Sequence, residues 1–338
     1  MAQFSLVLVK APILLAVPNV SEGRDTATIE CIGDAFASRD RSAAERRAVC
    51  LLDVHSDPDH HRSVYTLAGP TRELADALVG GAAQAVRSID VVSRAKADPA
   101  ERGAHPHVGA IDVVPLVYFN EGDRGAACAE ALAVADRIAT RLDVPVFLYG
   151  ELAGGRAGGT RAELRRGGVQ GLAARLAGAG GEPPLRPDFG PHRLHPIAGA
   201  TLVAAREPLV AFNLQLAAPA TLADARRIAA AIREGGQNGL PGLRAIGVAL
   251  REPNSEEIAQ VSMNVERPLE LPLAEAVLAV EAHAAIASAE LVGLAPRAAL
   301  EGFPPDLPMP GFDPSRHLIE NALANLAPAP EPAAPETG

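Results

Sequence analysis

The chain has 338 residues, a formal net charge of −10 and a hydrophobic content of 48%. Its length allows two domains with buried cores, and its hydrophobic content excludes disorder over most of the sequence. The acidic balance argues against a nucleic-acid partner, which needs a basic surface. Cys31, Cys50 and Cys128 lack the spacing of a metal site or a disulfide framework, so we expect a cytoplasmic protein.

The first half of the chain alternates predicted strands and helices. Hydrophobic runs typical of buried strands stand between Ala-rich segments with helical spacing. A polar turn at residues 19–25 precedes the first helix. The pattern predicts strands over 13–17, 49–54, 63–68, 111–118 and 144–149, and helices over 26–38, 70–87, 125–142 and 162–176.

A similar order returns in the second half, with strands over 209–216, 242–250 and 259–265 and helices over 222–234 and 273–288. Two consecutive units of this kind predict an α+β fold of two split-βαβ subdomains around a ligand crevice. We expect the subdomains at residues 1–182 and 183–302, followed by a largely disordered Pro/Ala-rich tail at 303–338. No stretch is long and apolar enough to suggest a membrane span.

Two histidines, His105 and His107, stand just before the predicted strand at 111–118. In an extended chain their side chains point to the same side. One of them could shuttle protons, because the ordinary pKa of histidine is near neutrality. Both could instead simply cap the strand. A third reading is a metal site with further ligands from His55, Asp57, Asp59, His60 and His61.

Residues 187–201 form another segment of interest, which is rich in glycine and proline. Such a composition predicts a shaped loop rather than a helix or strand. Backbone amides of a glycine-rich loop can approach a flat ligand and bind its carbonyl or carboxylate groups. The same composition also suits a linker between domains.

Together these segments resemble one family, glutamate formimidoyltransferase, which is the transferase half of formimidoyltransferase-cyclodeaminase. The resemblance runs in order from about residue 13 to residue 302. It rests on residues 17–24 (VPNVSEGR), 51–54 (LLDV), 62–66 (RSVYT), 105–113 (HPHVGAIDV), 144–151 (VPVFLYGE), 187–191 (PDFGP), 209–213 (LVAFN), 260–264 (QVSMN) and 290–294 (ELVGL).

The resemblance implies two ferredoxin-like subdomains that hold folate in a cleft between them. It also implies transfer of a formimino group between the N5 atom of tetrahydrofolate and the amine of glutamate, in histidine degradation. The catalytic histidine of the family falls on His105. The folate-contacting loop falls on Gly190, Pro191, His192, Arg193, Leu194, His195, Pro196, Ile197, Ala198 and Gly199.

The chemistry of this reaction suggests further site residues. Asp53 and Asp112, near predicted strand ends, could orient the histidine or hold the amine, or could simply cap those ends. Because the substrates carry carboxylates, arginines should gather locally; of Arg24, Arg62, Arg94, Arg193 and Arg206 we favour Arg62 and Arg206. Tyr65 is a candidate wall for the pterin ring. We expect small-molecule substrates, with tetrahydrofolate as co-substrate and no metal. We expect no nucleic-acid or membrane partner, and a homodimer is a candidate assembly.

Three departures from the family lie near the expected reaction centre. His107 stands where the family usually has arginine, His55 stands where it has an acidic residue, and the loop at residues 95–103 is longer than usual. They leave two alternatives open. One is a metal-dependent, amidohydrolase-like enzyme that uses His55, His60, His105 and His107. The other is a folate-binding paralogue with a different acceptor or without turnover.

Overall fold

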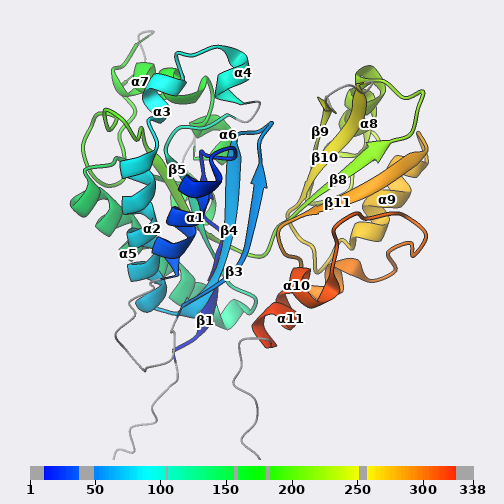
Figure 1. Ribbon diagram of the computed structural model, residues 1–338, viewed down its shortest axis with the longest axis horizontal. Helices are drawn as coiled ribbons and strands as arrows, with labels where there is room; N and C mark the ends of the chain where they lie inside the picture. The colour runs from blue at the N-terminus through cyan, green and yellow to red at the C-terminus, as the bar shows by residue number, and fades with distance from the viewer. Residues whose placement is uncertain are drawn as a thin grey trace, which may run out of the picture. The chain divides into compact units, whose positions relative to one another are not determined.

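The computed structural model describes residues 11–37, 49–103, 106–155, 159–179, 183–250 and 257–324 (Figure 1). The candidate catalytic residue His105 lies outside these ranges. The chain divides into two compact units at Pro208 and Leu209, which we call unit 1 and unit 2.

The sheet of unit 1 has antiparallel and parallel parts. β1 and β2 both lie between β4 and β5, so they form one strand that is interrupted at Val17 and Pro18. β3 pairs with β4 on one side, and β5, β7 and β6 continue the sheet in parallel on the other. The strands are β1 (Ile13–Ala16), β2 (Asn19–Val20), β3 (Cys50–Asp57), β4 (Arg62–Pro70), β5 (Ile111–Val117), β6 (Val146–Leu148) and β7 (Thr201–Arg206).

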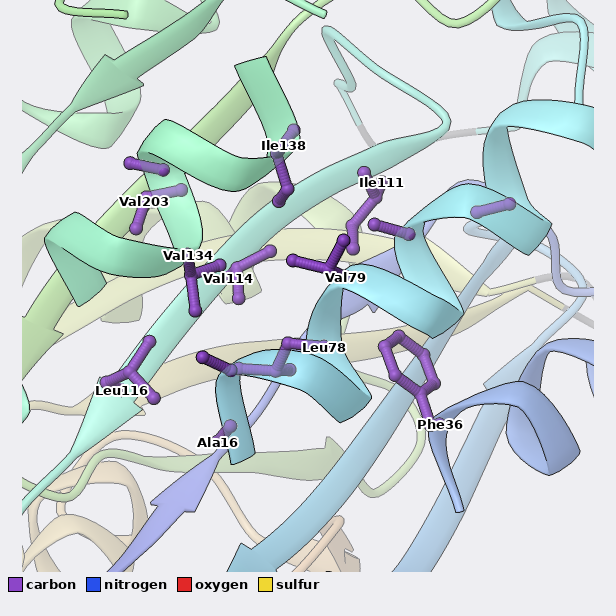
Figure 2. Packing of buried hydrophobic residues seen from close by; sticks show 14 of the residues in the cluster. Ala16, Phe36, Leu78, Val79, Ile111, Val114, Leu116, Val134, Ile138 and Val203 are labelled. Carbon is purple, nitrogen blue, oxygen red and sulfur yellow. The ribbon is translucent and has the colours of Figure 1, made fainter. Parts of the chain in front are cut away.

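Three long helices, α1 (Thr26–Phe36), α2 (Glu73–Ser88) and α5 (Arg124–Leu142), lie side by side on one face of this sheet. Figure 2 shows Leu78 of α2 and Val134 of α5 pointing toward the strands, where they join one buried cluster. Burial of these apolar side chains, at about 25 cal/mol per Å², fixes the helices on the sheet. The other described elements are α3 (Val91–Arg94), α4 (Pro99–Arg102), α6 (Arg161–Leu164), α7 (Gly168–Leu176) and the 3₁₀ turns Glu121–Asp123 and Gly150–Ala153.

The opposite face of the sheet carries a smaller core. Phe147 of β6 packs there with Leu164 of α6 and Leu172 of α7. Adjacent residues of a strand point to opposite faces, so a single strand serves both cores. Accordingly, Leu202 of β7 belongs to the smaller core and Val203 belongs to the larger one.

Unit 2 is an antiparallel sheet with the strand order β11-β8-β10-β9. Its element order, β-α-β-β-α-β, is that of the split βαβ motif. Val261 and Met263 of β10 pack with Ile228 of α8 and Val277 of α9. The elements are β8 (Val210–Leu216), α8 (Leu222–Ile232), β9 (Leu243–Leu250), β10 (Ile258–Val265), α9 (Leu273–Glu281) and β11 (Ile286–Val292), followed by Arg297–Leu300, α10 (Pro314–His317) and α11 (Ile319–Ala324).

These two sheets with their helices confirm the α+β fold, whereas the assignment of both halves as ferredoxin-like stays a prediction. The division at Pro208 falls later than the expected boundary at 182/183, because β7 completes the sheet of unit 1. Part of the expected tail is also ordered: residues 303–324 include α10 and α11, and Ile319 is buried. Residues 325–338 lie outside the described ranges.

Two predicted helices differ from the structure, and a strand is present where none was predicted. The helix expected over 273–288 ends at Glu281, and β11 begins at Ile286 within the same segment. β7 was not expected at all. The helix expected over 162–176 is split into α6 and α7 at Gly167 and Gly168, whose φ angles of 75° and 59° suit glycine and interrupt a helix. None of the helices in the described part of the chain is both long and apolar enough to cross a membrane.

Candidate active site

Four of the sequence motifs meet at one end of the unit 1 sheet, where β2 ends and β4 and β5 begin. We call this the near end. Backbone hydrogen bonds join the segments: Ser21 N–H donates to Ala110 O over 2.9 Å, and Ala110 N–H donates to Ala198 O over 2.8 Å. Val92 N–H of α3 donates to Ile197 O over 3.2 Å. The near end is therefore assembled from segments that are far apart in sequence.

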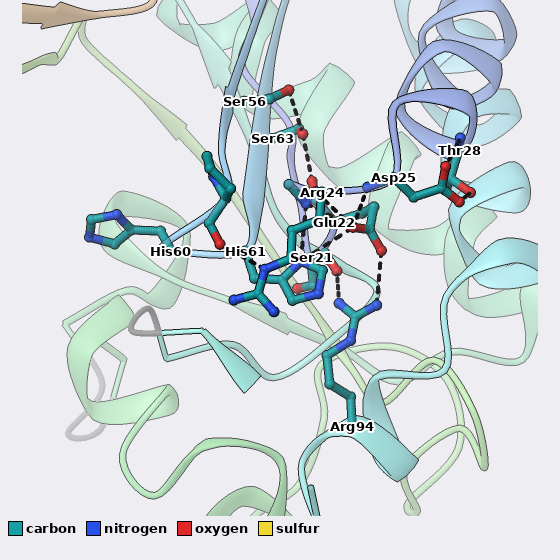
Figure 3. Close-up of polar contacts among 12 residues, drawn as sticks. Ser21, Glu22, Arg24, Asp25, Thr28, Ser56, His60, His61, Ser63 and Arg94 are labelled. Carbon is teal, nitrogen blue, oxygen red and sulfur yellow. Dashed lines mark hydrogen bonds and ion pairs between the residues drawn. The ribbon is translucent and has the colours of Figure 1, made fainter. Parts of the chain in front are cut away.

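Glu22 lies at the centre of the near end and is 6% exposed (Figure 3). Its Oε1 accepts the backbone N–H groups of Gly23, Arg24 and Asp25 over 3.1, 2.9 and 3.1 Å. Its Oε2 pairs with Arg94 Nη2 over 2.9 Å, and Arg94 also donates to Ser21 O. Burial by itself raises the pKa of Glu22, but these N–H donors and neighbouring positive charges lower it below its ordinary value. Glu22 is therefore an ionised carboxylate that holds Arg94 in place.

His61 lies next to the carboxylate of Glu22. Its Nδ1 accepts Gly23 N–H over 3.1 Å and lies 3.3 Å from Glu22 Oε1. Burial, and then the positive charge of Arg94, lower the pKa of His61 to about 4. At neutral pH the imidazole is therefore uncharged and carries its proton on Nε2, since Nδ1 must keep a lone pair to accept from Gly23.

Arg62 begins β4 directly opposite Asp57, but the two side chains are not paired. Asp57 accepts from His60 Nδ1, and its Oδ1 accepts the backbone N–H groups of Asp59 and His60 over 2.9 Å each. Burial alone raises the pKa of Asp57, yet these donors lower it to about 2. No described residue forms a side-chain hydrogen bond or ion pair with Arg62, its Nε is buried without an acceptor, and burial lowers its pKa. A half-buried arginine whose Nε has no acceptor is a natural partner for an anion.

Asp112 shapes the loop that precedes β5. It is 2% exposed, its Oδ1 accepts Val108 N–H over 2.7 Å, and its Oδ2 pairs with Arg165. Both carboxylate oxygens of Asp112 therefore already have partners within unit 1, so Asp112 stabilises the start of β5. Nearby, His107 Nε2 donates to Arg102 O over 3.1 Å, and burial lowers the pKa of His107.

The structure separates the other predicted site residues. Asp53 lies within β3, four residues before Asp57 and roughly 13 Å along the strand. Arg206 pairs across from Val117 at the opposite end of the sheet. Tyr65 is fully buried and donates to Ile29 O over 2.9 Å, so its prediction as a pterin wall is wrong: it is a core residue packed against Phe36.

His105 lies outside the described residues, together with Ala104. Gly103 and Pro106, on either side of this pair, line a pocket at the near end. Among the described residues, no group of three or more histidine, cysteine or acidic side chains could hold a metal ion.

The predicted folate loop runs along the near end from β6 toward β5. At its start, Val146 of β6 donates from its backbone N–H to Phe189 O over 3.0 Å. At its end, His195 Nδ1 accepts Ala198 N–H over 2.9 Å, and Gly199 pairs with Gly109. A side chain on Gly199 would meet Val108 O at 2.2 Å, so this close approach requires glycine. The loop is thus a shaped turn of unit 1 and not a linker.

Sequence reasoning assigned no role to two buried charges of the near end. Glu22 stands inside a recognised motif, where an acid before consecutive backbone N–H groups could have suggested a cap. Arg165 has no comparable sequence signal, because its partner Asp112 lies 53 residues away in the sequence.

Comparisons with known proteins agree with this description. The family described as formiminotransferase domain, N-terminal subdomain, matches residues 13–206, which is close to the extent of unit 1. The glutamate formimidoyltransferase of Streptococcus pyogenes is 33% identical over 319 residues, or 93% of this chain and 99% of that protein. That of Thermoplasma acidophilum is 33% identical over 289 residues, or 84% and 88%. The formimidoyltransferase-cyclodeaminase of Sus scrofa is 35% identical over 256 residues, which is 74% of this chain but 43% of that longer protein.

Proposed function

The chain belongs to the glutamate formimidoyltransferase family, and from this premise we propose that it transfers a formimino group between formiminoglutamate and tetrahydrofolate in histidine degradation. In the forward direction N5 of tetrahydrofolate attacks the formimino carbon and forms a tetrahedral intermediate. The bond from that carbon to the glutamate nitrogen then breaks. N5 loses a proton and the glutamate nitrogen gains one, so atoms and charge balance.

A single imidazole can take the first proton and return it to the leaving nitrogen. We assign this role to His105, and general acid–base catalysis of this kind contributes about 10²–10⁴-fold. The described residues that flank it in the sequence, Gly103 and Pro106, line the near-end pocket, and the proposal takes support from them. His61 is a weaker candidate, because its Nδ1 is already engaged by Gly23 N–H.

The observation that carries the proposal is the state of Arg62. It begins β4 within a family motif, it is half-buried with its Nε buried and without an acceptor, and no described side chain forms an ion pair or hydrogen bond with it, although the Asp57 carboxylate lies opposite on β3. Leaving an arginine in this state is costly unless an anion arrives. Both proposed substrates carry carboxylates, so we assign Arg62 to bind one of them.

The remaining expectations belong to the same proposal. The loop from Gly190 to Gly199 contacts the folate, and its turn geometry supports this by presenting backbone groups along the near end. We further propose that the reaction needs no metal, that the protein acts in the cytoplasm on small molecules without a nucleic-acid or membrane partner, and that a homodimer is its assembly.

The test follows formation of 5-formiminotetrahydrofolate by the purified full chain. We expect turnover by the wild type, and a kcat about 10²–10⁴-fold lower for His105→Ala with an unchanged Kd for tetrahydrofolate. His283→Ala in unit 2 is the matched histidine control and should keep wild-type kinetics. A wild type that binds no reduced folate would overturn the proposal.

Two other results would favour the alternatives. Folate binding without turnover for any amine would indicate a binding paralogue. Loss of turnover after treatment with a chelator, restored by a metal ion, would indicate the metal-dependent enzyme.

A further inference from the structure

A pocket of about 270 Å³ lies at the near end, between α3, the segment around Pro106 and the start of α7. All its lining residues belong to unit 1. Its volume is just below the range of about 300–1,000 Å³ that takes a whole drug-sized ligand. The pocket therefore suits one small group of a substrate and not an entire folate.

One side of this pocket is apolar. Val91 and Val169 are nearly fully buried members of the main core, and Ala95 packs against that core. Gln170 Nε2 donates to Ala95 O over 3.2 Å and ties the start of α7 to the end of α3. These walls fit a short aliphatic chain.

The polar side of the pocket is cationic. Arg94 and Arg102 both line it, and none of its lining residues is acidic. The charge of Arg94 is balanced by Glu22, but no described residue pairs with the Arg102 guanidinium. A pocket with an aliphatic wall and an unmatched arginine at its rim fits a carboxylate on a short carbon chain.

We propose that this pocket binds the carboxylate end of a glutamyl group. The inference rests on the proposed function, which supplies two sources of that chemistry: formiminoglutamate and the glutamyl tail of the folate. A neighbouring hollow of about 490 Å³ shares Arg94 but also contains the carboxylate of Glu101, so it serves as the comparison site.

The experiment compares two variants that act on the pocket in different ways. Ala95→Leu fills it, and Arg102→Gln removes the unmatched charge from an exposed position that leaves the core intact. Ala97→Leu fills the neighbouring hollow, and Arg87→Gln removes an exposed arginine on α2; these are the controls. Thermal unfolding of each variant checks that it is folded.

For each protein we would measure the KM for formiminoglutamate and the Kd values for L-glutamate, tetrahydrofolate and 6-methyltetrahydropterin, which lacks the glutamyl tail. Ala95→Leu and Arg102→Gln should each weaken one glutamyl ligand at least about tenfold. A higher KM for formiminoglutamate identifies the amino acid as the source. A higher Kd for tetrahydrofolate with unchanged pterin binding identifies the tail.

Three results would overturn the proposal: unchanged constants for both glutamyl ligands, an equal loss of pterin binding, or an equal effect of Ala97→Leu. Failure of the proposed function is distinguishable from these. If the wild type shows no formimino transfer and yet Ala95→Leu weakens binding of L-glutamate or tetrahydrofolate, the reaction is wrong and the pocket assignment stands.

Discussion

The near end of the unit 1 sheet contains buried ion pairs, whereas the ion pairs at the far end, where β5 and β7 finish, are more exposed. Glu22 and Asp112 are 6% and 2% exposed and are held by arginines and backbone N–H groups. At the far end Arg124 pairs with Glu121 and Glu151, but these side chains are 49%, 71% and 35% exposed. Burial makes each near-end partner necessary, whereas water can replace a far-end partner.

Glycines show the same contrast. At the near end, a Cβ on Gly23 would meet Asp57 O at 2.3 Å, and one on Gly109 would meet Ala200 O at 1.7 Å. At the far end, a Cβ on Gly122 meets nothing within 4 Å. At the near end, Gly23 and Gly109 therefore lie in close contact with the backbone of other segments. At the far end, Gly122 has free space around it. The near end therefore holds its charges in a rigid frame, and each prediction below tests that contrast.

The largest effect is expected for Gly109→Ala. The added methyl group overlaps the Ala200 carbonyl, so β5 and the loop before β7 must separate, which costs more than about 4 kcal/mol or prevents folding. Gly122→Ala should change the free energy of unfolding by less than about 0.5 kcal/mol. Urea unfolding followed by circular dichroism measures both. Equal stability of the two variants would contradict the close packing of the near end.

Asp112→Asn should destabilise the protein by about 3–5 kcal/mol. It leaves the buried Arg165 guanidinium, which has little access to water, without its counter-ion. The free energy of unfolding from urea titration is the measurement. A combined Asp112→Asn, Arg165→Met variant should recover much of the loss, and no recovery would show that the pair is not the cause.

Arg62→Gln should lower kcat/KM about 10–100-fold, because it removes a charge-assisted contact worth about 1.5–3 kcal/mol. Its stability should be unchanged or increased, since no described partner is left unpaired. Arg206→Gln, at the far end of the same sheet, should stay within about twofold of wild type. A similar kinetic loss in both variants would contradict the separation of the two ends.

His61→Asn should flatten the pH dependence of stability. The pKa of His61 is about 4 in the folded chain and near 6.5 when unfolded, so between these values the unfolded state binds more protons. Acidification from pH 6.5 to 4.5 should therefore cost the wild type about 2 kcal/mol through this residue. Asparagine tolerates the φ of 52° and can still accept Gly23 N–H. Urea unfolding at the two pH values tests this, with His283→Asn as the control that keeps the slope.

The smallest effect is expected for Arg124→Gln. Its ion pairs are exposed, so the free energy of unfolding should fall by less than about 1 kcal/mol, and by even less at high salt. A loss comparable to that of Asp112→Asn would mean that burial does not distinguish the two ends.

Strands with strong hydrophobic patterns, such as β5 and β10, were predictable from sequence. β7 and β11 were not, because TLVAAR and IASAELV are rich in alanine, which favours helices and carries little strand signal. Tyr65 was misassigned for a related reason. Alternation along a strand predicts that it shares a face with Ser63 and Leu67, but only the packing of α1 decides that this face is closed.

Motif positions located the near end, but the pairing of its charges could not be predicted. Glu22 and Arg94 are 72 residues apart, and their contact exists only after β2 and α3 are brought together. Arg62 was selected from the sequence because it stands within a segment that matches the family. Only the structure shows that the Asp57 carboxylate is hydrogen-bonded to His60 and that Arg62 Nε has no acceptor.

The sequence by itself determined the α+β class, the family, and the local features that depend on neighbouring residues, such as the strand break at Pro18 and the cap of α1 by Asp25. Tertiary structure alone decided which charges are buried and which of them are paired. The physical reason is the distance over which each kind of interaction acts. Backbone preferences and caps act over a few residues, whereas desolvation and ion pairing depend on distances through space that only the folded sheet sets. A net charge of −10 therefore coexists with an arginine-lined pocket and with an Arg62 side chain that forms no ion pair with a described residue.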